Sequence, residues 1–375
     1  MKKVRIGVIG IGIMGSAHVK TIQAGKVDGM EVSAISDANS SRSELFPDIP
    51  FFRNEEELIR SETVDAVLVA TPHYDHTRLG IATLEAGKHL LVEKPISVHK
   101  ADCLKLIAAH KDKALKFAAM FNQRTDPRYQ KLKALIDDGH LGEIRRVVWI
   151  ITDWFRTHSY YASGGWRATW AGEGGGVLLN QSPHQLDLWQ WLFGMPDKIR
   201  AFCELGRYHN IEVEDDVTCY MEYASGCKGV LITTTGESPG TNRLEITGEN
   251  GRVIIDSSVE GISWDRNETP MSEFSRTTEG AFDKPETWKI HIPSSGKGPQ
   301  HLGILQNFAD ALLKGKPLLA PGAEGIRSVE LANAMVYSSH IGQTIQLPLD
   351  AAAYSAFLED MIQSSASAKK AATKA

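Results

Sequence analysis

A glycine run near the N-terminus constrains the fold of this chain more than any other feature. Gly10, Gly12 and Gly15 follow the apolar strand pattern of Val4–Ile9 and precede a helical pattern. In a strand–turn–helix unit the first glycine permits a tight turn, the second lets the backbone approach a pyrophosphate, and the third allows close packing of the helix. The free N–H groups at the helix N-terminus then favour phosphate. The run therefore predicts a dinucleotide-binding unit.

An acidic residue lies where such a unit needs one. Asp37 ends the second predicted strand, 22 residues after Gly15. A carboxylate there can accept hydrogen bonds from the ribose hydroxyls of adenosine and repels a 2′-phosphate, so the pattern favours NAD over NADP. The alternative is that Asp37 only begins a turn, and the nearby Arg42 leaves phosphate binding open.

Apolar strand patterns alternate with helical patterns up to Arg124, as in βαβ units around a parallel sheet. The expected strands cover residues 4–9, 31–36, 66–70, 89–92 and 115–121, and the expected helices cover 14–24, 55–61, 78–86 and 100–111. We therefore expect an α/β fold that begins with a doubly wound Rossmann domain over residues 1–124.

The pattern changes after Arg124. A helix is expected over residues 127–138, followed by strands over 145–154, 217–223, 228–235, 243–247 and 252–256, with hairpin turns at 224–226 and 250–251. Residues 125–362 should form an α+β domain with a large, mainly antiparallel sheet, used for substrate binding and oligomerisation. Residues 363–375 are mostly Ser, Ala and Lys without apolar periodicity, which predicts a disordered tail.

Composition excludes several classes of function. The formal net charge is −5 and the basic residues are scattered, so a nucleic-acid partner is not expected. The apolar runs are far shorter than the roughly 20 residues of a membrane span, and we expect a cytoplasmic protein. The four cysteines contain no Cys-x-x-Cys pair, so neither a zinc site nor a disulfide framework is predicted.

Two motifs lie at the carboxyl ends of predicted strands, where open α/β sheets bind ligands. They are Thr71-Pro72 with His76, and Glu93-Lys94-Pro95; further along, residues 174–176 are three glycines that precede His184 and Asp187. Together with the first glycine run, this set resembles the Gfo/Idh/MocA family of glucose-fructose oxidoreductase and inositol dehydrogenases.

The resemblance implies an NAD-dependent oxidoreductase in which Lys94 lies beside the nicotinamide and the reacting hydroxyl. A cation there stabilises negative charge on the substrate oxygen. His184 is the candidate base, since imidazole accepts protons near neutral pH. Asn180, His184 and Asp187 have the spacing of one helix face, so Asn180 could bind a substrate hydroxyl and Asp187 could orient the ring. In inositol dehydrogenases the position matched by Asn180 is usually acidic, which sets this chain apart from them.

The catalytic residues predicted in this way are Lys94, His184 and Asn180. The residues expected to bind the cofactor NAD are Gly10, Gly12, Ile13, Met14, Gly15, Asp37, Thr71, Pro72, His76, Glu93, Lys94 and Asn122. His73 and His76 have no third ligand at a suitable spacing, so no metal site is predicted.

Arginines and aromatic residues are concentrated between the two predicted domains. Aromatic rings stack on sugar faces, and guanidinium groups bind hydroxyls or an anionic substituent, although core packing is an equal alternative for each ring. The stretch consists of Trp154, Arg156, His158, Tyr160, Tyr161, Trp166, Arg167 and Trp170. The predicted substrate-binding residues are Lys94, Arg156, Trp166, Arg167, Asn180 and His184.

The leading hypothesis is oxidation of a secondary hydroxyl of a sugar, sugar derivative or polyol by NAD. An alternative is an NAD-dependent glycosidase that oxidises carbon 3 transiently, eliminates the aglycone, adds water and returns the hydride. A third is a non-catalytic dinucleotide-binding sensor, against which the presence of both Lys94 and His184 argues. The expected partners are a small carbohydrate or polyol and further copies of the chain, as a homodimer or homotetramer.

Overall fold

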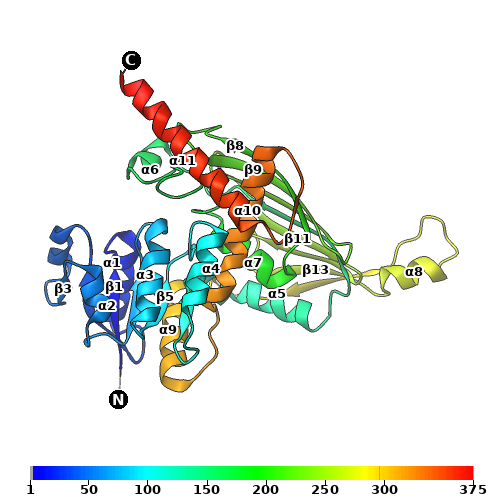
Figure 1. Ribbon diagram of the computed structural model, residues 1–375. Helices are drawn as coiled ribbons and strands as arrows, with labels where there is room; N and C mark the ends of the chain where they lie inside the picture. The colour runs from blue at the N-terminus through cyan, green and yellow to red at the C-terminus, as the bar shows by residue number, and fades with distance from the viewer. Residues whose placement is uncertain (1–2, 295, 375) are drawn as a thin grey trace.

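Two sheets organise the chain. The computed structural model describes residues 3–294 and 296–374, with side chains up to residue 366. Figure 1 shows the N-terminal unit, in blue and cyan, beside a broad second sheet in green and yellow, with helices α4, α7 and α10 between them. The predicted combination of an α/β unit with a mainly antiparallel sheet is confirmed.

The first sheet is parallel and has the strand order β3-β2-β1-β4-β5-β6. Its strands are β1 (Val4–Ile9), β2 (Met30–Ser36), β3 (Phe51–Phe52), β4 (Ala66–Val69), β5 (His89–Val92) and β6 (Phe117–Ala119). The connecting helices are α1 (Ile13–Gln23), η1 (Ser40–Leu45), α2 (Glu55–Arg60), α3 (His73–Glu85) and α4 (Lys100–Ala109). The order reverses between β1 and β4, and open α/β sheets bind dinucleotides at that point.

Helix α3 begins five residues before the predicted start at Arg78. Pro72 immediately precedes it with φ −58° and ψ 154°, and proline suits a helix start because its φ is fixed and its missing N–H would have no helical partner. The early start places His73 and His76 in the first turn of α3, against the carboxyl end of the sheet.

The second sheet has nine strands in the order β14-β13-β12-β11-β7-β10-β9-β8-β15, and its only parallel pair within the described residues is β7 with β10. The strands are β7 (Ile144–Ile151), β8 (Lys198–Leu205), β9 (Glu214–Glu222), β10 (Lys228–Thr234), β11 (Asn242–Gly248), β12 (Gly251–Asp256), β13 (Ile262–Asn267), β14 (Thr287–Ile292) and β15 (Ile345–Gln346). The expected hairpins β9–β10 and β11–β12 are present, whereas β8, β13, β14 and β15 were not predicted.

The remaining helices lie around this sheet. They are η2 (Asn122–Thr125), α5 (Pro127–Asp137), α6 (His158–Ala162), α7 (Pro183–Phe193), α8 (Met271–Thr277), α9 (Gln300–Lys314), η3 (Gly322–Glu324), α10 (Gly325–Ile341) and α11 (Ala351–Lys374). Helix α7 packs between α5 and α10, and Trp189 on it stacks on Trp149 of β7 at 6.5 Å between ring centroids. This packing fixes α7 firmly on the inner face of the sheet.

Helix α9 corrects the expected domain division. It lies within the range 125–362 but contributes Ile304, Leu305 and Phe308 to the hydrophobic core of the first sheet and contacts β1. Figure 1 shows it, in orange, beside β5. The chain therefore returns to the Rossmann unit after completing the second sheet, and a single cut after residue 124 does not separate the two cores.

The expectation of a disordered tail is also wrong, because α11 continues to Lys374. The tail is rich in alanine, the residue with the highest helix propensity, and this outweighs its lack of apolar periodicity. Residue 375 lies outside the described residues. Among the described helices, none has the length and apolar character needed to cross a membrane.

Candidate active site

The glycine loop between β1 and α1 has the shape a pyrophosphate requires. A Cβ on Gly10, where φ is +91°, would lie 2.6 Å from the carbonyl oxygen of Ala70, and one on Gly15 would lie 1.8 Å from that of Gly10. Among the described residues, only Arg42 comes within 4 Å of a Cβ position on Gly12, at 3.6 Å. The first and third glycines therefore pack tightly while the second leaves its backbone accessible, which fits a bound dinucleotide.

The first turn of α1 presents apolar side chains to the surface. Ile13 is 82% exposed and Met14 is 37% exposed, at the end of the helix where phosphate N–H donors lie. Such exposed apolar side chains beside the glycine loop are consistent with a surface that becomes covered when a cofactor binds.

Asp37 closes the same loop from β2. Its Oδ2 accepts the N–H of Ile11 at 2.7 Å and Nη1 of Arg42 at 2.8 Å, and its Oδ1 accepts the N–H of Asn39 at 2.8 Å. The carboxylate is therefore held at the end of β2, where a ribose would lie. Arg42 partly neutralises this charge, so the preference between NAD and NADP depends on both residues.

The loops after β4 and β5 are tied together by His76. Its Nδ1 lies 2.7 Å from the carbonyl oxygen of Pro95 and its Nε2 lies 2.8 Å from that of Thr71. Burial lowers the pKa of His76, against the opposing effect of these two carbonyls. The predicted Thr71-Pro72 and Glu93-Lys94-Pro95 motifs therefore form one edge of the site, and neither nitrogen of His76 is free for a metal. Within residues 3–294 and 296–374, no group of three or more His, Cys, Asp or Glu side chains is arranged to hold a metal ion.

Glu93 is a buried carboxylate at this edge. Burial opposes its ionisation, but the hydrogen bond and charge of His18, whose Nε2 lies 2.7 Å from Oε1, outweigh burial and lower the pKa of Glu93 to about 2. Glu93 thus stays negatively charged directly beside Lys94.

Two buried polar atoms at the carboxyl edge have no hydrogen-bond partner among the described residues, namely Oγ1 of Thr71 and Oδ1 of Asn122. The amide of Asn122 donates to Oε1 of Gln300 at 2.6 Å. Because buried polar atoms in proteins are nearly always paired, unpaired ones at this edge fit a site that a ligand completes.

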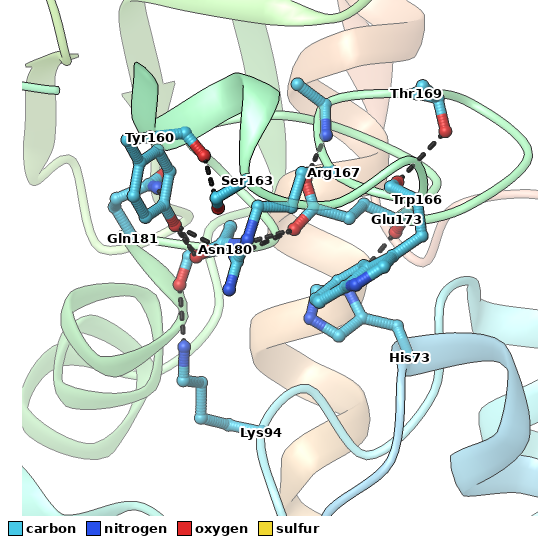
Figure 2. A network of polar contacts seen from close by, with 11 residues as sticks. His73, Lys94, Tyr160, Ser163, Trp166, Arg167, Thr169, Glu173, Asn180 and Gln181 are labelled. Atoms are coloured by element: carbon cyan, nitrogen blue, oxygen red, sulfur yellow. Dashed lines mark hydrogen bonds and ion pairs between the residues drawn. The ribbon is translucent and has the colours of Figure 1, made fainter. Parts of the chain in front are cut away.

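Lys94 reaches from the first sheet to the second domain. Its Nζ donates to the backbone oxygen of Asn180 at 2.7 Å, as Figure 2 shows. Burial lowers the pKa of Lys94, whereas the charges of Glu93 and Glu173 raise it. The ammonium therefore lies between the two domains with two carboxylates near it.

His184 lies in the first turn of α7, edge-on to Phe121 at 6.4 Å between ring centroids. Burial and the charge of Lys94 hold its pKa well below the usual value, so the imidazole is neutral. Its Nδ1 is buried without a partner among the described residues. A neutral imidazole near a lysine ammonium can accept a proton from a substrate hydroxyl.

Asn180 is not on the helix face predicted for it. Helix α7 begins at Pro183, and Asn180 lies in the turn before it. Proline at the first helical position sets the start of α7, because its fixed φ favours a helix N-terminus. Asn180 nevertheless meets Lys94, through its backbone oxygen rather than its side chain.

Asp187 does not orient His184 as predicted. Its two oxygens accept Nε and Nη2 of Arg124 at 2.7 and 2.6 Å, and Gln190 donates to Oδ1 at 3.0 Å. The carboxylate therefore anchors α7 to the end of the Rossmann unit, and it acts on His184 only through the helix.

Part of the Arg- and aromatic-rich stretch gathers above Lys94. The guanidinium of Arg167 lies 4.8 Å from the ring of Tyr160 and 4.7 Å from that of Trp166, and Arg156 lies 5.0 Å from Tyr160. Trp166 packs edge-on against His73 at 5.8 Å, as Figure 2 shows. Nε of Arg156 is buried and unpaired among the described residues.

Two other residues of the stretch, Trp170 and His158, pack within the second domain. Trp170 is 2% exposed in the core of the second domain. His158 packs against His209, which is bound to Asp215 and to the backbone oxygen of Arg156.

Both halves of the chain match known families. Residues 4–121 match the oxidoreductase family with an NAD-binding Rossmann fold, and residues 129–254 match the GFO/IDH/MocA C-terminal domain. The chain belongs to the Gfo/Idh/MocA family. Membership confirms the predicted fold class, enzyme class and cofactor, NAD.

Relatives in this family include dehydrogenases. Inositol 2-dehydrogenase 1 of Saccharopolyspora erythraea is 39% identical over 146 residues, which are 37% of this chain and 43% of that enzyme. scyllo-Inositol 2-dehydrogenase (NADP(+)) of Bacillus subtilis is 25% identical over 362 residues, 92% of this chain and 96% of that enzyme. The WlbA dehydrogenase from Bordetella pertussis, solved with NADH and UDP-GlcNAcA, is 25% identical with a TM-score of 0.77, and the match covers 93% of this chain and 100% of that one.

Two residues of this Gfo/Idh/MocA protein lie at the site without having been predicted there. His301 on α9 packs against His18 at 5.6 Å between ring centroids, and its charge acts on Glu93 and His184. Glu173 is buried beside Asn180. His301 had no sequence signal because the docking of α9 is a long-range contact, whereas Glu173, directly before residues 174–176, could have been found from its place in the motif.

Proposed function

We propose that the protein oxidises a secondary hydroxyl of a sugar, sugar derivative or polyol. The observation that supports this most is the reach of Lys94 from the edge of the NAD-binding sheet to Asn180, four residues before His184. An ammonium and a neutral imidazole between a cofactor domain and a cluster of aromatic and arginine side chains suit alcohol oxidation.

In the proposed mechanism Lys94 holds the substrate hydroxyl and stabilises negative charge on its oxygen. The imidazole of His184 accepts the hydroxyl proton, since burial keeps it neutral. NAD, when bound, supplies the acceptor for the hydride that leaves the same carbon. The predicted substrate residues Arg156, Trp166 and Arg167 would hold the rest of the sugar, and the unpaired Nε of Arg156 would accommodate a hydroxyl or an anionic group.

The proposed cofactor contacts follow from the loops described above. The backbone around Gly10, Gly12, Ile13, Met14 and Gly15 would receive the pyrophosphate, and Asp37 the ribose. Thr71, Pro72, His76, Glu93 and Asn122 would form the nicotinamide edge. The unpaired Oγ1 of Thr71 and Oδ1 of Asn122 support this assignment.

The test is to incubate the protein with NAD and a panel of sugars, inositols, sugar acids and aryl glycosides, while recording NADH absorbance and aglycone release together. Stoichiometric NADH from a free sugar or polyol is the expected result. Aglycone release without net NADH formation would contradict the dehydrogenase proposal and support the NAD-dependent glycosidase. Tight NAD binding without either signal would favour a sensor.

A further inference from the structure

Glu173 is a buried acid at the substrate side of the site. Its side chain is 2% exposed, its Oε2 accepts the N–H of Ala168 at 2.6 Å, and its Oε1 accepts the amide of Asn180. Nη1 of Arg167 lies 3.9 Å from Oε1. Figure 2 shows these groups converging above Lys94. Burial raises the pKa of Glu173, while the hydrogen bonds from Ala168 and Asn180 and the charges of Arg167 and Lys94 oppose this effect and favour the carboxylate.

Asn180 connects this acid to Lys94. The side-chain amide of Asn180 donates to Glu173, while its backbone oxygen accepts Nζ of Lys94 at 2.7 Å. The hydroxyl of Tyr160 donates to Oδ1 of Asn180 at 3.3 Å. Both the side chain and the backbone of Asn180 are therefore fixed, and a displacement of Glu173 would be transmitted to the ammonium.

The balance of charge around Lys94 also depends on Glu173. Three cationic groups share this region, because Arg156 and Arg167 both act on Lys94 and lower its pKa. Of the two carboxylates that oppose them, Glu93 is already bound to His18. Without Glu173, Lys94 would face two guanidinium groups with only one engaged carboxylate, in a site where burial already disfavours its charge.

We propose that Glu173 is a positioning residue: it holds Asn180 in place and supplies the negative charge that keeps Lys94 protonated and aligned. The role assigned to Lys94 rests on the proposed function, whereas the effect of Glu173 on its ionisation does not.

The test compares Glu173→Gln with the wild type by a measurement that needs no turnover. The pH dependence of Lys94 acylation by an amine-reactive ester, followed by mass spectrometry, reports the pKa of that amine. Removing one nearby opposite charge should lower this pKa, so that Lys94 reacts about tenfold faster at pH 8. Glu85→Gln, at the exposed end of α3, is the matched control and should leave the labelling rate unchanged.

A double variant moves the charge instead of deleting it. In Glu173→Gln/Asn180→Asp the carboxylate returns on the neighbouring side chain, and the labelling rate should return toward that of the wild type. If a substrate is known, the pKa of Lys94 can also be read from the pH dependence of kcat/KM. This pKa should fall in Glu173→Gln and return toward the wild-type value in the double variant. Unchanged labelling in a folded Glu173→Gln variant, or no recovery in the double variant, would overturn the proposal. Absence of turnover in the wild type would bear only on the proposed function.

Discussion

At the scale of single residues, burial decides what the side chains of the site can do. The same desolvation that holds His184 neutral also lowers the pKa of Lys94, but two carboxylates, Glu93 and Glu173, oppose this effect at Lys94, whereas Glu93 alone opposes it at His184. The site thus combines a neutral proton acceptor with a cation stabilised by Glu93 and Glu173. The surroundings of each group set its charge, because burial disfavours the protonated form of both side chains and nearby carboxylates favour the ammonium of Lys94.

Replacing the proposed base should remove most of the activity. His184→Gln should lower kcat/KM by about 10²- to 10⁴-fold, the usual contribution of a general base. Initial rates of NADH formation measure this, and calorimetric titration with NAD should show unchanged affinity. His291→Gln, on the exposed edge strand β14, is the control. Equal losses in both variants, or full activity in His184→Gln, would contradict the assignment.

Neutralising the predicted ribose acceptor should change cofactor choice. Asp37→Asn keeps an acceptor for the N–H of Ile11 but removes the charge and releases Arg42. The loss of a hydrogen bond between the ribose and a charged group should raise the KM for NAD by about tenfold or more. The KM for NADP should fall, because the released Arg42 can bind the 2′-phosphate. Asp48→Asn, on the exposed surface nearby, should alter neither KM. A KM ratio that stays at the wild-type value would remove Asp37 from the ribose site.

At the scale of elements, local signals predicted the first domain better than the second. Strands β1 and β5 match their predicted limits because short apolar runs lie between clear turn residues. Strands β8, β13 and β14 carry few buried residues, so their patterns resemble loops. The position of α9 and the partner of Asp187 depend on contacts between distant segments, which no local pattern contains.

Sequence alone could indicate those site residues whose side chains are themselves acids, bases or cations within a recognisable motif. Lys94 and His184 were predicted from motif and spacing; Nζ of Lys94 reaches Asn180 of the second domain, and His184 lies in the first turn of α7. Glu173 was not predicted although it lies directly before the glycines at 174–176, because the sequence does not show that its carboxylate is buried against Asn180. Asn180 was placed on the wrong element, since helical spacing does not reveal that Pro183 starts α7.

The element after the glycine run is held by another buried acid. Oε1 of Glu214 on β9 accepts the N–H groups of Gly176 and Leu178 at 2.8 and 3.1 Å, while its Oε2 is buried without a partner among the described residues. Burial raises the pKa of Glu214 from 4.5 to about 7. The unfolded chain loses this proton first, so its stabilising contribution is present below pH 4.5 and is lost as pH rises through about 7.

Glu214→Gln should therefore reduce the loss of folding stability that the wild type shows as pH rises through about 7. Glutamine keeps an oxygen for the two N–H groups and cannot ionise, so it avoids a loss on the order of 3 kcal/mol. Thermal unfolding at pH 5 to 9 measures the difference, with Glu222→Gln at the half-exposed end of β9 as control. The same decline of Tm in wild type and Glu214→Gln would contradict a buried, protonated Glu214.

At the scale of the whole molecule, the outer face of the nine-stranded sheet has no helix across it in Figure 1. Half-buried Val148, Ile150, Val230 and Ile232 lie there on the neighbouring strands β7 and β10, and Phe202 on β8 is 59% exposed. An apolar face of this kind fits the predicted homodimer or homotetramer.

Ile232→Lys should weaken such an assembly about 100-fold, the effect of losing about 3 kcal/mol of apolar burial. Light scattering after size-exclusion chromatography measures the mass, and Lys26→Glu, exposed on the N-terminal domain, is the control. A monomeric wild type at micromolar concentration would contradict the prediction.

The two sheets are coupled through Arg124, at the end of the Rossmann unit. Its guanidinium and the carboxylate of Asp187 are each 1% exposed, and Glu324, its other acidic partner, is 32% exposed. Asp187→Asn leaves a buried cation without its main partner, and such changes cost about 3–5 kcal/mol. Guanidinium chloride unfolding should show this loss, with Asp137→Asn on the surface of α5 as control.

Asp187→Asn should also affect catalysis, because Asp187 and His184 both lie on α7. If Arg124 sets the position of α7, then Asp187→Asn should lower kcat while leaving the KM for NAD unchanged, since the glycine loop belongs to the other sheet. A loss of stability without any change in kcat would instead show that α7 keeps its place through packing against α10 and the sheet, and that the ion pair joins the domains without aligning the proposed base.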